Sequence, residues 1–279
     1  MDHQPPTAIM AIVNLTTDSF YAPSRVGDAA EAIRIARQLL AGDADLVDLG
    51  AAASNPSAGA VTAAEEIARL TPVLEGLGDL IARVSVDSFQ PAVQHFALDR
   101  GVGFLNDIQG FGDATIYPAL AAASCKLIIM HATQRGGIAD LDGTLTARTA
   151  LDNIICFFEA RVAQLECAGI ARDRLILDPG MGYFLSPQPE ASLGVLANLD
   201  RLKSAFGLPI LVSVSRKSFL RATTGLATEA LGPASLAAEL HAVARGANFV
   251  RTHSPGELRS ALRVEQALSD ARQLGGGSS

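Results

Sequence analysis

The sequence predicts an α/β protein that folds as a single barrel of eight parallel strands, each followed by a helix. Short apolar runs alternate with helical patterns along the 279 residues, and parallel strands need such crossover helices. Several runs also stop at Asp, Asn, Arg or His, as expected when parallel strands point their carboxyl ends at one shared pocket. We expect one domain over residues 1–279, with flexible ends at 1–7 and 273–279.

The predicted strands are the apolar runs at 8–14, 45–50, 83–87, 102–106, 126–131, 174–178, 209–214 and 248–252. The predicted helices lie near 28–41, 62–77, 90–100, 114–123, 147–169, 191–206, 230–245 and 255–271. In the first helix, one face at helical spacing carries Ala29, Ile33, Ala36 and Leu40. A doubly wound open sheet usually carries a G-x-G-x-x-G turn after its first strand, and this chain has none there. The pattern therefore favours a (β/α)8 TIM barrel.

Composition narrows the class of protein. The chain is 49% hydrophobic and 18% charged, with a net charge of −7 and an isoelectric point near 5.2. The acidic balance argues against a nucleic-acid surface, and no apolar run approaches the ~20 residues that span a bilayer. The three cysteines form no C-x-x-C pair, so neither a zinc site nor a disulfide framework is indicated. We expect a cytoplasmic protein with neither nucleic-acid nor membrane partners.

Polar side chains stand where the predicted strands end. Four examples are Asn14, Asp87, Asn106 and Asp178. The seventh strand is followed by Arg216 and Lys217, and the eighth ends at Arg251 and His253. In a barrel all these ends meet at one face, so we expect the side chains to share a cavity.

Nine segments together resemble dihydropteroate synthase. In family order they are IVNLTTDSF at 12–20, VDLGAAASNP at 47–56, VSVDSF at 84–89, LNDIQG at 105–110, LIIMH at 127–131, LILDPGMG at 175–182, SVSRKSFL at 213–220, SLAAELHA at 235–242 and VRTH at 250–253. The resemblance implies a homodimeric TIM-barrel enzyme of folate biosynthesis. It would condense 6-hydroxymethyl-7,8-dihydropterin pyrophosphate with p-aminobenzoate, giving 7,8-dihydropteroate and pyrophosphate.

The resemblance implies that the pterin is bound by Asp87, Asn106, Met130, Asp178 and Lys217. The chemistry suits this assignment, because a carboxylate has two acceptor oxygens for the adjacent NH2 and NH of a pterin edge. Purely structural roles remain open at this point: a turn cap for Asp178, a helix N-cap before Gln90 for Asp87, and a loop contact for Asn106.

The resemblance implies that Asn14, Arg251 and His253 bind the pyrophosphate. It also implies Mg2+ as the cofactor, with Asn14 as its ligand. Arg251 and His253 are two residues apart on an extended segment, so their side chains point the same way. A guanidinium binds phosphate oxygens bidentately, and Mg2+ prefers oxygen ligands and often bridges phosphates.

For p-aminobenzoate the resemblance implies Ser54, Pro56, Tyr183, Phe184, Lys217 and Ser218, with Ser218 at the start of a helix. Loops at 15–21 and 51–57 would close over the amine. The predicted catalytic set is Asp87, Asp178, Lys217, Arg251 and His253. These groups suit a dissociative substitution, in which pyrophosphate leaves before the aniline nitrogen attacks.

Two loops depart from the usual pattern of the family. The second loop reads AAASNPS at 51–57 where most members read GESTRPG, so a Glu and an Arg are lost. After DPG, the usual GFGK is replaced by Gly182, Tyr183, Phe184 and Leu185. These departures resemble the sulfonamide-insensitive dihydropteroate synthases carried on mobile elements. We expect Phe184 to form a wall that rejects the projecting sulfonyl substituent and admits the flat substrate.

Four alternatives remain at this level. An ordinary sulfonamide-sensitive synthase would lack this discrimination. A pterin-binding methyltransferase would share the barrel but would release no pyrophosphate. A Schiff-base aldolase would use Lys217 as its nucleophile, and a binding protein would have no activity at all.

Overall fold

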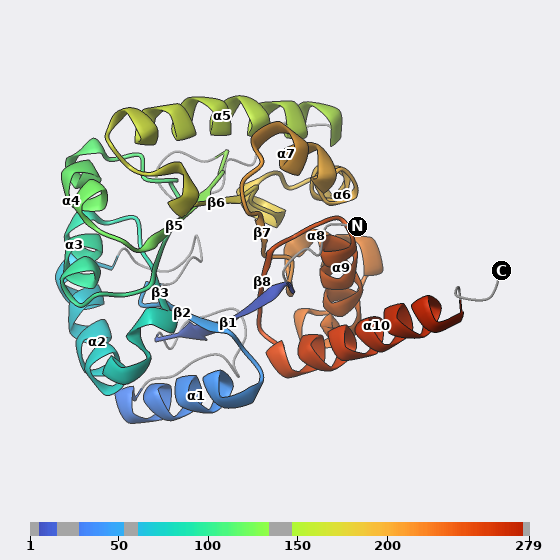
Figure 1. Ribbon diagram of the computed structural model, residues 1–279, viewed down its shortest axis with the longest axis horizontal. Coiled ribbons are helices and arrows are strands. Elements are labelled where there is room, and N and C mark those ends of the chain that lie inside the picture. The colour runs from blue at the N-terminus through green and yellow to red at the C-terminus, as the bar shows by residue number, and fades with distance from the viewer. Residues whose placement is uncertain (1–5, 16–27, 53–60, 134–146, 276–279) are drawn as a thin grey trace.

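A computed structural model of the chain describes residues 6–15, 28–52, 61–133 and 147–275. Eight parallel strands form a ring surrounded by helices (Figure 1), which confirms the predicted (β/α)8 barrel. The strands are β1 Ala8–Asn14, β2 Leu46–Gly50, β3 Val84–Asp87, β4 Phe104–Asp107, β5 Lys126–Met130, β6 Leu175–Asp178, β7 Leu211–Val212 and β8 Phe249–Thr252.

The sheet runs in the order β6-β5-β4-β3-β2-β1-β8-β7. The two ends of this order meet at a parallel bridge between Leu177 and Ile210, where the Leu177 amide also donates to the carbonyl of Pro209 over 2.9 Å. The expected strand at 209–214 is therefore regular only at 211–212, because its first residues form this junction.

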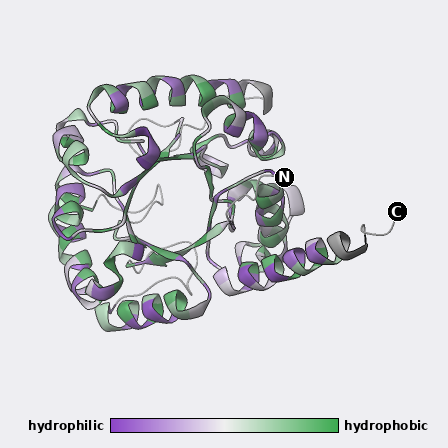
Figure 2. Ribbon diagram, viewed as in Figure 1, coloured by the Kyte–Doolittle hydropathy of each residue, from purple (hydrophilic) through white to green (hydrophobic). Residues whose placement is uncertain are grey.

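The α-helices surround the ring (Figure 1). They are α1 Ala29–Gly42, α2 Ala63–Gly76, α3 Pro91–Asp99, α4 Tyr117–Ala122, α5 Ala147–Cys167, α6 Pro189–Ala197, α7 Leu199–Phe206, α8 Ser218–Thr224, α9 Gly232–Ala244 and α10 Pro255–Gly275. The helices carry both hydrophobic and hydrophilic residues along their length (Figure 2), as expected when one face of each packs on the strands. No helix in the described ranges is long and apolar enough to cross a membrane.

Local sequence signals explain where several helices begin and end. The Asp28 side chain caps α1 by accepting from the Ala30 amide at 3.1 Å. Thr62 and Glu65 form a reciprocal capping box at the start of α2. The stretch expected to be one helix at 191–206 is two, since the chain departs from helical geometry at Asn198.

The start of α8 and the two ends of the chain can be compared with the sequence predictions. Ser218 begins α8, as expected. Of the ends expected to be flexible, residues 1–5 and 276–279 lie outside the described ranges, whereas α10 continues to Gly275.

The inside of the barrel changes character along the strands. Near the amino-terminal ends a small apolar cluster fills it, made of Met10, Leu46, Ile128, Ile176 and Leu211 with Phe104 and Phe249 against them. Side chains alternate between the two faces of a strand, so the positions two and four residues further on also point inward. On β2 these are Asp48 and Gly50, and on β6 the next is Asp178. The carboxyl ends therefore gather polar side chains inside the barrel above an apolar cluster.

Candidate active site

An arginine held between two carboxylates forms the centre of the polar end. Arg251 on β8 donates from Nε to Asp48 Oδ2 at 2.5 Å and from Nη2 to Asp87 Oδ2 at 2.9 Å. The Asp48 side chain is fully buried, and the Arg251 side chain is 15% exposed. Burial and the neighbouring charge of Asp48 raise the pKa of Asp87 to about 7, while the Arg251 charge opposes that shift. This ion-pair triad ties β2, β3 and β8 together inside the barrel.

Asp48 is the site residue that the sequence analysis missed. Its Oδ2 also accepts from Asn106 Nδ2 on β4 at 3.1 Å, while its Oδ1 is buried and has no hydrogen-bond partner among the described residues. Asn106 is 4% exposed, and its Oδ1 likewise finds no partner in the described ranges. A buried acceptor without a donor costs about 1–3 kcal/mol, so these oxygens favour a ligand that brings N–H groups.

Asp87 and Asn106 lie beside each other in the sheet. Cα register places Asn14, Gly50, Asp87 and Asn106 side by side across β1 to β4. The alternative reading of Asp87 as a helix cap is wrong, because Gln90 is the N-cap residue of α3 and Ser88, not Asp87, accepts from its amide. The Asp87 carboxylate is turned into the barrel instead.

Asp178 both caps a turn and faces the cavity. Its Oδ1 accepts from the Gly180 amide at 2.9 Å, as the turn interpretation of the D-P-G segment predicted. Its Oδ2 makes no hydrogen bond with any described residue. Burial raises the pKa of Asp178 to about 6, with the charges of Lys217 and Arg251 acting against this rise. One oxygen thus stabilises the loop, and the other remains for a ligand.

The turn after Asp178 needs glycine. Gly180 has φ +69°, and a Cβ there would stand 2.1 Å from the carbonyl oxygen of His131 and 3.4 Å from Met130 Cε. A contact of 2.1 Å excludes any side chain. The close approach brings the Asp178 turn against the end of β5, where Met130 was expected to contact the pterin.

Lys217 points into the cavity from a strained loop. Arg216 before it has φ 56°, which is unusual for a residue with a side chain. Contacts to a short 3-10 helix, η6 Thr228–Ala230, hold this conformation: the Arg216 Nη1 donates to the carbonyls of Thr228 and Glu229 at 2.9 and 3.1 Å. Burial and the nearby Arg251 charge lower the pKa of Lys217 to about 8, whereas Asp178 and Asp87 favour its charged form.

His253 is a neutral imidazole at neutral pH. Its Nδ1 lies 3.1 Å from Ser215 Oγ on the β7 side of the cavity. Burial, together with the charges of Arg251, Lys217 and Arg216, lowers the pKa of His253 to about 3. It can therefore serve an anion as a hydrogen-bond donor, as predicted, but adds no positive charge.

Asn14, the predicted magnesium ligand, ends β1 at the carboxyl end of the barrel. The described residues provide few other ligands for a metal ion. A Cβ on Gly50 would stand 3.2 Å from Asn14 Oδ1, so the amide oxygen lies over the end of β2. Among the described residues no group of three or more His, Cys, Asp or Glu side chains is placed to hold a metal ion. One amide oxygen fits Mg2+ only if most other ligands are water or phosphate oxygens.

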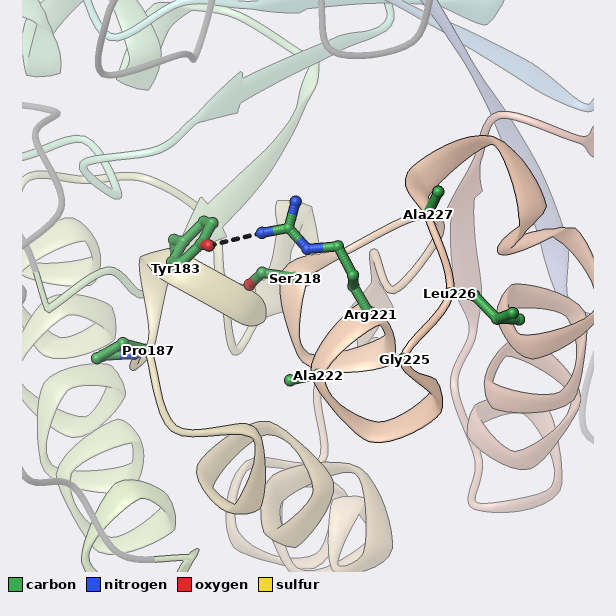
Figure 3. Close-up of a pocket in the computed structure, with 8 residues that line it drawn as sticks. All are labelled: Tyr183, Pro187, Ser218, Arg221, Ala222, Gly225, Leu226 and Ala227. Carbon is green, nitrogen blue, oxygen red and sulfur yellow. Dashed lines mark hydrogen bonds between the residues drawn. The ribbon is translucent and has the colours of Figure 1, made fainter.

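The residues expected around p-aminobenzoate are divided between described and other segments. Lys217 Nζ lies 4.8 Å from the centre of the Phe184 ring, a cation–π distance. A Cβ on Gly182 would stand 2.9 Å from Ser218 Oγ, so this glycine makes room for the serine. Ser54 and Pro56 lie outside the described residues, as do most of the loops expected to close over the amine. Tyr183 is 39% exposed, and its hydroxyl oxygen accepts from Arg221 Nη2 on α8 at 3.0 Å (Figure 3).

Comparison with known proteins agrees with this geometry. Residues 10–253 match the family model described as pterin binding enzyme. The chain is 57% identical to dihydropteroate synthase type-1 of Escherichia coli, over 96% of this chain and 98% of that protein. It is similar to a dihydropteroate synthase of Burkholderia cenocepacia solved with 7,8-dihydropteroate, with a TM-score of 0.85, 30% identity, and coverage of 96% and 94% of the two chains. It is also similar to the dihydropteroate synthase of Xanthomonas albilineans solved with 4-aminobenzoic acid. That comparison has a TM-score of 0.81 and 32% identity, and covers 94% of this chain and 93% of the other.

Proposed function

This chain belongs to the dihydropteroate synthase family, a family of transferases, and we propose that the polar end of its barrel carries out that reaction. The substrates are 6-hydroxymethyl-7,8-dihydropterin pyrophosphate and p-aminobenzoate. The observation that carries the proposal is the meeting of Asp178, Lys217 and Arg251 in one cavity, where each influences the pKa of another. A methyltransferase that uses pterin remains the main alternative chemistry, and pyrophosphate release separates the two.

The pterin takes the deepest position. Asp178 presents its free Oδ2 to the adjacent NH2 and NH of the ring, and the unpaired oxygen of Asn106 accepts from a further ring N–H. Lys217 donates to the ring carbonyl or a ring nitrogen. Met130 supports a face of the ring from β5. Buried acceptors that have no donor among the described residues favour this bicycle, which carries several N–H groups on one edge.

The reaction breaks the C–O bond to pyrophosphate and forms a C–N bond to the amine. As the C–O bond breaks, positive charge on the pterin methylene spreads into the ring, where the carboxylates of Asp87 and Asp178 stabilise it. The aniline nitrogen then attacks the methylene and loses a proton to solvent. The leaving pyrophosphate is met by Arg251, by a hydrogen bond from His253, and by Asn14.

Magnesium fits this scheme as a partner of the pyrophosphate rather than a resident of the protein. Asn14 would hold it through the side-chain oxygen. When bound, Mg2+ neutralises part of the charge on the departing phosphate oxygens. Arg251 makes two of its hydrogen bonds to Asp48 and Asp87, so its charge is shared, and an additional cation helps an anionic leaving group.

Steady-state assay of dihydropteroate formation tests the proposal. We expect pyrophosphate and dihydropteroate to appear in equal amounts, and only when both substrates are present. Asp178→Asn should reduce kcat/KM by about 10²–10³-fold, because the amide replaces one acceptor with a donor. A wild-type enzyme that forms no dihydropteroate would contradict the assignment.

We also propose that the enzyme works in the presence of sulfonamides and belongs to the sulfonamide-insensitive subgroup. Support comes from the bulky pair after DPG: the Phe184 ring packs on the Lys217 ammonium at 4.8 Å and narrows the space beside it. A sulfonyl group is tetrahedral and its substituent leaves the plane of the ring, so it meets this wall while a planar carboxylate does not.

Sulfamethoxazole inhibition of wild type and Phe184→Gly tests this discrimination. We expect weak inhibition of the wild type and inhibition at least tenfold tighter in the variant, with a KM for p-aminobenzoate changed far less. Leu193→Gly, an exposed site on α6, is the matched control and should leave inhibition unaltered. Tight inhibition of the wild type would place the chain among ordinary synthases.

The expected homodimer has a candidate surface on α10. Val264 and Leu268 are 59% and 52% exposed and stand four residues apart, so they share one helix face. We propose that this face is covered by a second copy. Light scattering should give twice the chain mass for the wild type and a shift toward monomer for Leu268→Glu. A wild type that is monomeric at assay concentrations would refute the dimer.

We expect the enzyme to work in the cytoplasm. All three cysteines, Cys125, Cys156 and Cys167, are free thiols, which is the usual state in a reducing compartment.

A further inference from the structure

A groove opens on the outer side of Ser218, between the segment after β6 and helix α8 (Figure 3). It has a volume of about 530 Å³ and is lined by Tyr183, Pro187, Ser218, Arg221, Ala222, Gly225, Leu226 and Ala227. Ser218 lies at its border with the proposed substrate cavity, because the Ser218 hydroxyl sits over Gly182 and Lys217 is the preceding residue. The groove therefore continues the space in which the amine substrate binds.

Arg221 supplies positive charge to this groove. It lies three residues after Ser218 on α8, so the two side chains share a helix face. Its Nη2 is 3.0 Å from the hydroxyl oxygen of Tyr183, and Figure 3 shows the guanidinium turned toward that ring across the groove. Within the part of the chain that the structure describes, no carboxylate forms an ion pair with Arg221. A guanidinium has five N–H donors, and the Tyr183 contact uses one.

The orientation of the amine substrate brings an anion to this place. The amino group must reach the pterin methylene, deep in the barrel near Asp87 and Lys217. The carboxylate is at the opposite end of the flat ring and so points outward, past Ser218. The second loop offers no help, since residues 51–61 contain neither Arg nor Lys. A planar guanidinium matches a planar carboxylate bidentately.

We propose that Arg221 binds the carboxylate of the amine substrate and that Tyr183 positions Arg221 for this role. The inference rests on the proposed function and names the group that selects its second substrate. The carboxylate has two possible sources: the aminobenzoate ring itself, or an amino acid joined to the ring by an amide bond. The lining of the groove includes the apolar residues Ala222, Leu226 and Pro187, which suit the hydrocarbon part of both.

Steady-state kinetics of Arg221→Gln with three amines tests the proposal. The amines are p-aminobenzoate, 4-aminobenzamide, which is its neutral isostere, and N-(4-aminobenzoyl)glycine, whose carboxylate lies further out. We expect the KM for the charged amines to rise at least tenfold. The KM for 4-aminobenzamide and that for the pterin pyrophosphate should change less than twofold. A larger rise for p-aminobenzoate places the bound carboxylate on the ring, and a larger rise for the glycine conjugate places it on the side arm.

Three further variants sharpen the result. Arg221→Lys should recover part of the loss, because the charge remains while the bidentate geometry does not. Tyr183→Phe should raise the same KM a few-fold in the wild-type background and have no effect in Arg221→Gln, as expected of a residue that acts through the arginine. Arg245→Gln removes an exposed arginine at the end of α9 and should change nothing.

Two outcomes would overturn the inference. The first is an unchanged KM for both charged amines in Arg221→Gln. The second is an equal loss for 4-aminobenzamide, which would mean that the substitution disturbs the site rather than removing a charge contact. Either result would leave the wild-type synthase activity standing, whereas a wild type inactive with every amine would refute the proposed function itself.

Discussion

The two ends of the barrel interior are built from the same eight strands but differ in what they contribute. At the amino-terminal end, Met10, Ile128 and Ile176 pack against one another and exclude water. At the carboxyl end, Arg251 is paired with the fully buried Asp48 and the largely buried Asp87. Burying one aliphatic side chain stabilises a fold by about 1.5–3 kcal/mol, whereas a buried ion pair often contributes nothing net. The apolar end thus stabilises the folded barrel, and the polar end offsets part of that stabilisation.

The polar end is also incompletely satisfied. Buried oxygens of Asp48, Asn106 and Ser213 have no hydrogen-bond partner among the described residues, and each costs about 1–3 kcal/mol. Such acceptors favour a ligand that brings N–H groups. The two ends lead to three predictions about where activity and stability separate.

The largest expected effect is on activity at the polar end. Lys217→Met should lower kcat/KM by about 10²–10³-fold, since it removes a charge that contacts the substrate. The free energy of unfolding should stay constant or rise, because burial already disfavours the ammonium, as its pKa of about 8 shows. Product formation and urea denaturation measure the two quantities. A variant that loses both activity and stability would mean that the lysine also supports the fold.

The converse is expected at the apolar end. Ile176→Ala should lower the free energy of unfolding by about 2–5 kcal/mol, because it opens a cavity in a packed cluster. Ile176 is 2% exposed and lies two residues before Asp178 on β6. We expect kcat/KM of the folded enzyme to remain within about threefold of the wild type, because Asp178 keeps its hydrogen bond from the Gly180 amide and the other site residues lie on other strands. A hundredfold loss would show that the two ends are not separable.

The smallest expected effect concerns a buried carboxylate outside the site. Glu239 on α9 is 1% exposed, and burial raises its pKa to about 7. An acid with a raised folded-state pKa binds its proton more tightly when folded, so wild-type stability falls as the pH rises from about 4.5 to 7. Glu239→Gln removes this loss. We expect roughly 2 kcal/mol of added stability at pH 8 and almost none at pH 4.

Thermal or urea unfolding of wild type and Glu239→Gln at the two pH values checks the sign, with activity assayed alongside. Activity should not change, because Glu239 faces Thr252 and Arg216 outside the cavity. A variant less stable at pH 8 than the wild type would mean that Glu239 remains ionised and paired in the folded state.

Much of the fold followed from the sequence because parallel barrel strands are short apolar runs with polar ends. Asp178, Asn106 and Arg251 were found by that rule. Asp48 was not, since it stands inside the run LVDLG and ends no strand. Its signal was alternation: it lies two residues after the inward Leu46. The break between α6 and α7 at Asn198 was not predicted either, because the sequence keeps a helical pattern on both sides of it.

The contacts of long side chains were beyond prediction. That the Phe184 ring lies on Lys217, and that Tyr183 turns the other way to Arg221, depends on a loop whose path is set by Gly180 and Gly182. The family resemblance had placed both aromatic rings beside the amine.

The crowded turn at Gly180 has a consequence for how this enzyme can adapt. A side chain at Gly180 would collide with the backbone of β5, and one at Gly182 would press on Ser218. The first positions beyond this turn that tolerate bulk are 183 and 184. Side-chain size in this loop can therefore vary first at these two positions, and their rings contact Lys217 and Arg221.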